Sequence, residues 1–164
     1  MELPAAAKLV GLVLVALGVI LSTYGAYVYL SGPHDVGVVY LEATFKRADS
    51  HYELNTFSAL PQEVVRVYGS PGNLPRVETD WKYGCFAGIY VLVTVDGTTL
   101  GPFCNEGLPV IGYIFGLPTF TGKLYVSPGV HSVGIRAFYG RTPIGSTSRQ
   151  ITVPTYDDVK EGRT

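Results

Sequence analysis

The hydrophobic positions of the chain fall into one long run near its start and many short runs after it. Residues 9–30 contain no charged side chain and no polar face, and Lys8 precedes them. As a helix rising about 1.5 Å per residue, this run would extend roughly 33 Å, which is enough for a hydrocarbon core of about 30 Å. The pattern predicts a transmembrane helix over residues 9–30, ended by Ser31-Gly32-Pro33.

The flanks of this run suggest how it lies in a membrane. Aromatic residues gather at its far end, as in an interfacial belt, and they are Tyr24, Tyr27 and Tyr29. The α-amine, Glu2 and Lys8 precede the run, whereas Asp35 and Glu42 follow it before the first basic pair, Lys46-Arg47. The positive-inside rule then favours a cytoplasmic head of residues 1–8 and an extracytoplasmic remainder. A cleaved signal peptide is the alternative, although its apolar core is normally about 7–15 residues.

After a short linker of residues 31–35, the pattern changes to short β-type runs. Runs rich in β-branched and aromatic residues cover 36–45, 63–68, 88–95, 98–100, 123–126, 130–139 and 146–153. Turn residues separate them about every ten positions, and no stretch after residue 31 has a helical period. We expect an all-β domain over residues 36–154, an antiparallel two-sheet β-sandwich of seven or eight strands, and a polar tail over 155–164.

Asp96-Gly97 is the strongest local turn signal in the chain. Two β-type runs flank it, and a type I′ turn requires positive φ at both central residues, which Asp and Gly tolerate. The turn would pair Val95 with Thr98. Because proline cannot donate a hydrogen bond to a ladder, we expect regular pairing to stop at Gly101-Pro102.

The chain has two cysteines, Cys85 and Cys104, and both fall in the predicted exterior domain. An even count outside the cytoplasm favours one disulfide, and two buried free thiols are the alternative. On a straight ladder from the Asp96-Gly97 turn the two positions would lie roughly 13 Å apart, whereas bonded Cα atoms lie within about 7 Å. A disulfide therefore requires Cys104 to curl back toward Cys85.

Charge and motifs exclude several functions. Lys+Arg is 12 and Asp+Glu is 13, so the basic excess of a nucleic-acid-binding protein is missing. The three histidines, His34, His51 and His131, have no metal-ligand spacing and are expected to be surface or strand residues. Haem, phosphate-loop and nucleophile-elbow motifs are absent. We expect no catalytic residue, no cofactor, no metal and no small-molecule substrate.

Two acidic groups come nearest to a catalytic or cation site. Glu78 and Asp80 lie beside Trp81 and would share one face of a strand. Asp157-Asp158 and Glu161 would hold a cation only loosely, and a solvated acidic tail is the simpler interpretation. Neither group leads us to expect an enzyme.

Residues 107–122 form an uncharged apolar segment that Pro109 and Pro118 interrupt. It is too short to cross a bilayer as a helix. Two interpretations stay open, namely a buried strand with its turns and an apolar surface for a partner subunit. Such a surface would offer Val110, Ile111, Tyr113, Ile114, Phe115, Leu117 and Phe120.

The closing strands resemble those of immunoglobulin-like and fibronectin type III-like domains of surface proteins. Residues 124–137 contain a Pro-Gly turn followed by an alternating strand, and residues 150–154 end the domain. The resemblance implies an immunoglobulin-like sandwich. Trp81 precedes both cysteines, so the intersheet disulfide of that family is not carried over.

The overall layout, an apolar helix followed by a β-sandwich, is similar to that of archaeal pilin-type surface proteins. The chain departs from them at Ala5-Ala6-Ala7-Lys8, which is not a basic leader with a processing site, and at the early Gly32-Pro33 break. We expect a single-pass anchored protein that contacts the bilayer through residues 9–30. It would bind other protein subunits, copies of itself included, at the cell surface or as an accessory subunit of a membrane complex. The alternative is a filament subunit, by helix bundling or by adding the segment after Pro33 to a neighbour's sheet.

Overall fold

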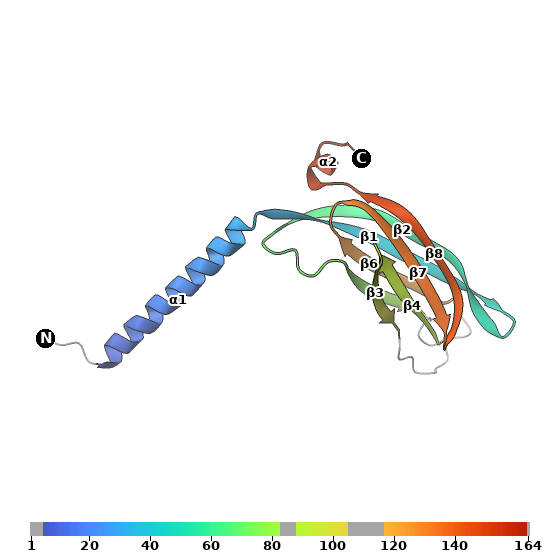
Figure 1. Ribbon diagram of the computed structural model, residues 1–164, viewed down its shortest axis with the longest axis horizontal. Helices are drawn as coiled ribbons and strands as arrows, with labels where there is room; N and C mark the ends of the chain where they lie inside the picture. Colours follow the sequence, from blue (N-terminus) through green and yellow to red (C-terminus); the bar gives the residue numbers. More distant parts are fainter. Residues whose placement is uncertain (1–4, 83–87, 105–116, 164) are drawn as a thin grey trace. The chain divides into compact units, whose positions relative to one another are not determined.

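The computed structural model describes residues 5–82, 88–104 and 117–163, and these form two helices and eight strands (Figure 1). They group into two compact units, Met1–His34 with Arg66–Gly72 and Asp35–Val65 with Asn73–Thr164. The elements are α1 (Ala5–Leu30), β1 (Pro33–Ala48), β2 (His51–Tyr68), β3 (Arg76–Lys82), β4 (Ile89–Val95), β5 (Thr98–Phe103), β6 (Thr119–Val126), β7 (Gly129–Tyr139), β8 (Thr142–Val153) and α2 (Tyr156–Lys160).

Helix α1 confirms the helix expected from the apolar run. Its stretch Leu9–Tyr27 is 19 residues long, has a mean hydropathy of 2.2 and is not buried at all. Within Leu9–Tyr27, each leucine, valine and isoleucine side chain is at least 50% exposed. The Tyr27 carbonyl accepts hydrogen bonds from the backbone N–H and the hydroxyl of Ser31 at the end of the helix. The helix is long and apolar enough to cross a membrane.

The eight strands form two four-stranded sheets, which confirms the all-β two-sheet sandwich. The first sheet has the order β2-β1-β6-β3 and the second has the order β5-β4-β7-β8. Neighbours such as β1 and β6, or β4 and β7, are antiparallel. Because β6 lies in the first sheet and β7 in the second, the connection Ser127-Pro128 passes from one sheet to the other.

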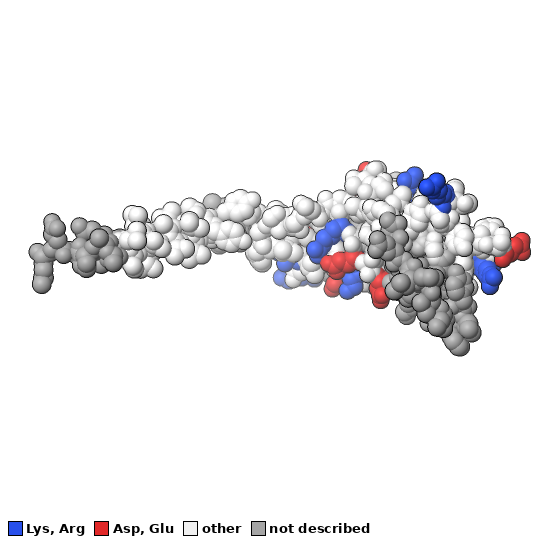
Figure 2. Space-filling view, turned by 90° about the horizontal axis from the view of Figure 1, so that it is seen from below, with Lys and Arg blue, Asp and Glu red and all other residues white. Residues whose placement is uncertain are grey.

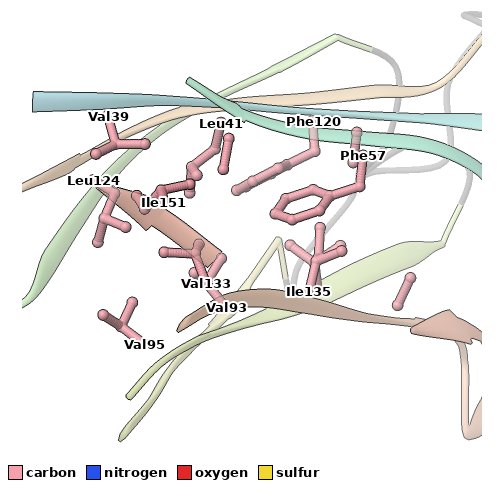
Figure 3. Close-up of a cluster of buried hydrophobic side chains, with 14 of the residues drawn as sticks. Val39, Leu41, Phe57, Val93, Val95, Phe120, Leu124, Val133, Ile135 and Ile151 are labelled. Atoms are coloured by element: carbon pink, nitrogen blue, oxygen red, sulfur yellow. The ribbon is translucent and has the colours of Figure 1, made fainter. Parts of the chain in front are cut away.

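Alternate residues of the strands fill the space between the sheets (Figure 3). In β7 the alternate residues Val133, Ile135 and Ala137 are fully buried. Ile151 and Val153 of β8 are buried on one face of that strand. The two sheets contribute to one continuous core, in which the largest fully buried side chains are Phe45, Phe120, Leu41, Ile89, Leu124 and Ile135.

The β4–β5 hairpin has the expected turn. Asp96 has φ 50° and Gly97 has φ 84°, and Val95 pairs with Thr98. The register shifts at Gly101-Pro102, the point at which regular pairing was expected to stop, but pairing resumes where Phe103 meets Val91. The ladder therefore has a bulge at the proline and does not end there.

Three features differ from the sequence expectations. Strand β1 begins at Pro33, inside the expected linker, and β2 starts at His51 although only its end, from residue 63, was expected. The first part of β2 was missed because its exposed polar residues and Pro61 obscure the alternation. The polar tail contains α2, in which the Thr155 hydroxyl accepts a hydrogen bond from the Asp158 N–H and the Asp158 carboxylate accepts one from the Thr155 N–H.

Candidate functional site

The outward side of β1, β6 and β3 presents one polar surface, which we call the β6 face. The strand register places Tyr40 and Glu78 on either side of Lys123, and Glu42 and Asp80 on either side of Thr121. Glu78 and Asp80 therefore share one face of a strand, as the sequence predicted. A hollow of about 420 Å³ lies here, lined by Tyr40, Glu78, Thr79, Asp80, Thr121, Gly122 and Lys123.

One end of the β6 face holds three side chains that contact one another through an ion pair, a hydrogen bond and a cation–π contact. Arg76 lies 3.3 Å from one carboxylate oxygen of Glu78, and the Tyr125 hydroxyl donates to the other at 2.9 Å. The Arg76 guanidinium carbon also lies 4.4 Å from the centroid of the Tyr125 ring. The hydrogen bond to the Glu78 carboxylate raises the pKa of Tyr125. Both oxygens of Glu78 are thus engaged, which leaves this carboxylate poorly placed for acid–base catalysis.

The centre of the β6 face has charges without such partners. Within the part of the chain that the structure describes, the ammonium of Lys123 and the carboxylate of Asp80 make no ion pair. Figure 2 shows acidic and basic side chains intermixed on the side of the molecule that it displays. The centre of the β6 face therefore presents exposed charges of both signs beside tyrosines.

The second candidate site is a histidine clasp at one end of the sandwich. His131, the third residue of β7, points Nδ1 at Asp96 Oδ2 at 2.6 Å and Nε2 at the carbonyl oxygen of Ser127 at 2.7 Å. The other carboxylate oxygen of Asp96 accepts a hydrogen bond from the Ser132 N–H at 2.8 Å. The backbone N–H of Asp96 donates a hydrogen bond to the Ser132 carbonyl at 3.0 Å. The clasp joins the β4–β5 turn to the connection between the two sheets.

The two ionisable groups of the clasp shift in opposite directions. Burial lowers the pKa of His131, but hydrogen bonds to the Asp96 carboxylate and the Ser127 carbonyl outweigh it and raise the pKa overall. Hydrogen bonds from His131 and from the Ser132 N–H lower the pKa of Asp96. Both shifts favour the charged form of the group, so the contacts of the clasp stabilise an imidazolium beside a carboxylate. The sequence missed it because 35 positions separate its two residues.

The remaining histidines lie on strands, and the acidic tail makes hydrogen bonds within itself. His34 lies on β1, and His51 lies on β2 with Nε2 3.6 Å from Glu53. The Asp158 carboxylate accepts hydrogen bonds from Thr155 and from Arg163 2.9 Å away. Among the described residues no group of three or more His, Cys, Asp or Glu side chains is arranged to hold a metal ion.

The residues that were expected to contact a membrane or a partner differ in how far their side chains are exposed. Tyr24 and Tyr27 are 68% and 63% exposed on α1, while the side chain of Tyr29 lies outside what the structure describes. Leu117 is 55% exposed, but Phe120 is fully buried in the core, so its assignment to a partner surface is wrong. It points inward because alternate residues of β6 face the second sheet. Five residues of that surface lie outside the described residues, namely Val110, Ile111, Tyr113, Ile114 and Phe115.

The predicted disulfide stays a prediction. Cys85 lies outside the described residues, and Cys104 has φ 66° immediately after β5. No free thiol is found in the described part of the chain.

Each edge strand of the two sheets carries a feature that hinders the addition of another strand. Pro61 interrupts β2, Gly101-Pro102 distorts β5, and charged side chains alternate along β3. On β8, Arg149 pairs with buried Val133 and so projects toward the core side. Its guanidinium donates to the Phe57 carbonyl at 2.5 Å. An inward charge on an edge strand is a known device against edge-to-edge pairing.

Comparison of the chain with protein-family models, with curated proteins and with solved structures gives no match. The immunoglobulin-like and pilin-like resemblances therefore gain no support beyond the two-sheet architecture itself. The chain has an N-terminal helix able to cross a membrane and a two-sheet antiparallel β-sandwich.

Proposed function

We propose that the chain is a single-pass membrane-anchored protein whose extracytoplasmic β-sandwich binds another protein and catalyses no reaction. One observation carries the proposal. The large apolar side chains of Leu9–Tyr27 are exposed all round the helix, and the hydrophobic core is built from residues of the strands β1, β2, β4, β6, β7 and β8. A helix that is hydrophobic all round needs an apolar environment, and a bilayer supplies one.

The anchor is tested by placing charge in the middle of α1. The ten aliphatic side chains of Leu9–Tyr27 favour insertion by about 0.3–0.6 kcal/mol each, and each central arginine costs about 2.5–3.5 kcal/mol. The double variant Leu14→Arg/Gly18→Arg should therefore lose insertion, and a Cβ at Gly18 meets no neighbour that would confuse the result. We expect it to leave the alkaline-washed membrane fraction, whereas Leu14→Ala/Gly18→Ala should remain. Equal retention of both variants would contradict the anchor.

The β6 face supports a protein-binding role. Tyrosine and arginine are the residue types enriched at protein interfaces, and Tyr40, Arg76 and Tyr125 lie on this face with Lys123 and Asp80. Chemical cross-linking of intact membranes tests this role. Lys123→Glu should abolish cross-linked species that the unmodified chain forms, while Arg141→Glu, an exposed cation in the turn between β7 and β8, should retain them. Persistence of the same species with Lys123→Glu would refute the β6 face as the contact.

The strand-exchange form of the filament alternative fits the structure less well. The segment after Pro33 is β1, which lies between β2 and β6 in the first sheet and buries Leu41, Ala43 and Phe45 completely. Donating it to a neighbour would expose this core. The guarded edges of both sheets likewise offer a poor site for a neighbour's strand.

A further inference from the structure

His131 is the only buried polar side chain in the part of the chain that the structure describes, and its side chain is 11% exposed. It borders a hollow of about 130 Å³ lined by Leu74, Pro75, Val95, Asp96, Thr98, Val126 and Ser127. Burying a polar ring costs free energy unless its nitrogens are hydrogen-bonded. Both ring nitrogens are bonded here, so the side chain is built into the fold.

The two partners of the ring determine how many protons it carries. The Asp96 carboxylate oxygen and the Ser127 carbonyl oxygen are both acceptors, at 2.6 and 2.7 Å from the ring nitrogens. A neutral imidazole has one N–H and one lone pair, so one of these short contacts would set a lone pair against a lone pair. Only the doubly protonated ring satisfies both.

No second charge competes with Asp96 for the ring. The segment before β3 contributes Leu74 and Pro75, and the end of β6 contributes Val126 and Ser127. The β4–β5 hairpin contributes Val95, Asp96 and Thr98. Among the described residues that line this hollow, Asp96 is therefore the one charged group facing His131. Its position is fixed independently by its two hydrogen bonds with the backbone of Ser132.

We propose that His131 is a pH-controlled latch, which holds the Ser127-Pro128 connection against the β4–β5 hairpin while its ring carries both protons. When the pH rises, the proton on Nδ1 stays on the ring and remains hydrogen-bonded to the Asp96 carboxylate. The proton on Nε2 is lost to the solvent. The Ser127 carbonyl then loses its donor and faces a lone pair. Because this connection joins the two sheets, its release loosens one end of the sandwich around the hollow. The latch is closed below the raised pKa of the His131 ring and opens above it.

The latch is tested directly on the full chain in detergent micelles, labelled with nitrogen-15 in its histidine rings. Nuclear magnetic resonance from about pH 5 to about pH 10 reports the protonation of each ring nitrogen. We expect the ring of His131 to be mostly doubly protonated at the ordinary histidine value of 6.5, where a free ring is half deprotonated, and Nε2 to lose its proton above that pH. Amide exchange at Ser127 and Gly129, corrected for its intrinsic pH dependence, should accelerate over the same range. A ring that is mostly singly protonated at pH 6.5, or unchanged exchange at these amides, would overturn the proposal.

A pair of matched variants isolates the role of the Asp96 carboxylate. Asp96 and Asp49 both lie in turns with positive φ, 50° and 41°, where asparagine is tolerated. Asp96→Asn should lower the pH at which His131 loses its second proton by about one unit, and accelerate exchange at Ser127 and Gly129 about tenfold at neutral pH. Asp49→Asn should change neither quantity. Equal behaviour of the two variants would refute the latch, and the titration of the unmodified chain decides the question even if Asp96→Asn does not fold.

Discussion

Gly37 of β1 is a site at which a single methyl group should strain the sandwich. A Cβ at this position would lie 2.1 Å from Cγ1 of Val153 on β8 and 3.6 Å from the carbonyl oxygen of Val126. Val153 is 2% exposed, and a β-branched side chain has few alternative rotamers. Gly37→Ala should therefore act as overpacking and cost about 1–3 kcal/mol of unfolding free energy.

A double-mutant cycle distinguishes this clash from a backbone effect. Val153→Ala alone removes two buried methyl groups and should cost about 2 kcal/mol. In Gly37→Ala/Val153→Ala the new methyl occupies part of the vacated space, so the double variant should be at least about 0.5 kcal/mol more stable than additivity predicts.

Urea unfolding of the full chain in detergent, followed by tyrosine fluorescence, measures each free energy. Gly11→Ala in α1 is the control, because a Cβ there meets nothing within 4 Å apart from the adjacent backbone of its own helix. Additive effects of the two substitutions, or a Gly37→Ala variant as stable as the unmodified chain, would refute the reasoning.

Three further predictions concern the edge, the β6 face and the latch. Arg149→Met should remove the donor to the Phe57 carbonyl and lower the unfolding free energy by about 1 kcal/mol. It should also cause concentration-dependent association, which light scattering detects. A strictly monomeric variant would argue against a role of Arg149 in protecting the edge. Glu78→Gln should return the pKa of Tyr125 toward its usual value, because the carboxylate acceptor is lost. A pH titration followed by tyrosinate absorbance measures this change. An unchanged titration would show that the hydrogen bond does not raise the pKa. The pKa of His131 is raised in the folded state, so the stabilisation that this group provides is complete below about pH 6.5 and is lost as the pH rises through the folded-state pKa. The unfolding free energy should therefore fall over that range. His131→Phe should abolish the fall, and identical pH profiles of the variant and the unmodified chain would contradict the prediction.

The candidate sites were accessible to sequence reasoning to different degrees. Glu78 and Asp80 could be placed on one face because the side-chain period of a strand is two residues. Their neighbours Tyr40 and Lys123 could not be found, since they come from other strands whose order in the sheet is not a local property. His131 was expected to lie on a strand or at the surface, and only its contact with the distant Asp96 turn reveals the clasp.

The sequence by itself determined the elements whose causes are local. The unbroken apolar run gives α1, the alternation of Val133, Ile135 and Ala137 gives the inner face of β7, and Asp96-Gly97 gives the turn between β4 and β5. Backbone geometry ties each pattern to one conformation, so neighbouring residues suffice.

Tertiary structure alone decided which strands became neighbours. It placed β1 between β2 and β6, extended β2 along a polar edge, buried Phe120 instead of offering it to a partner, and closed the His131–Asp96 clasp. The physical reason is that pairing and burial depend on the free energy of packing two whole sheets together. That free energy sums over residues far apart in the chain, and no short window of sequence contains it.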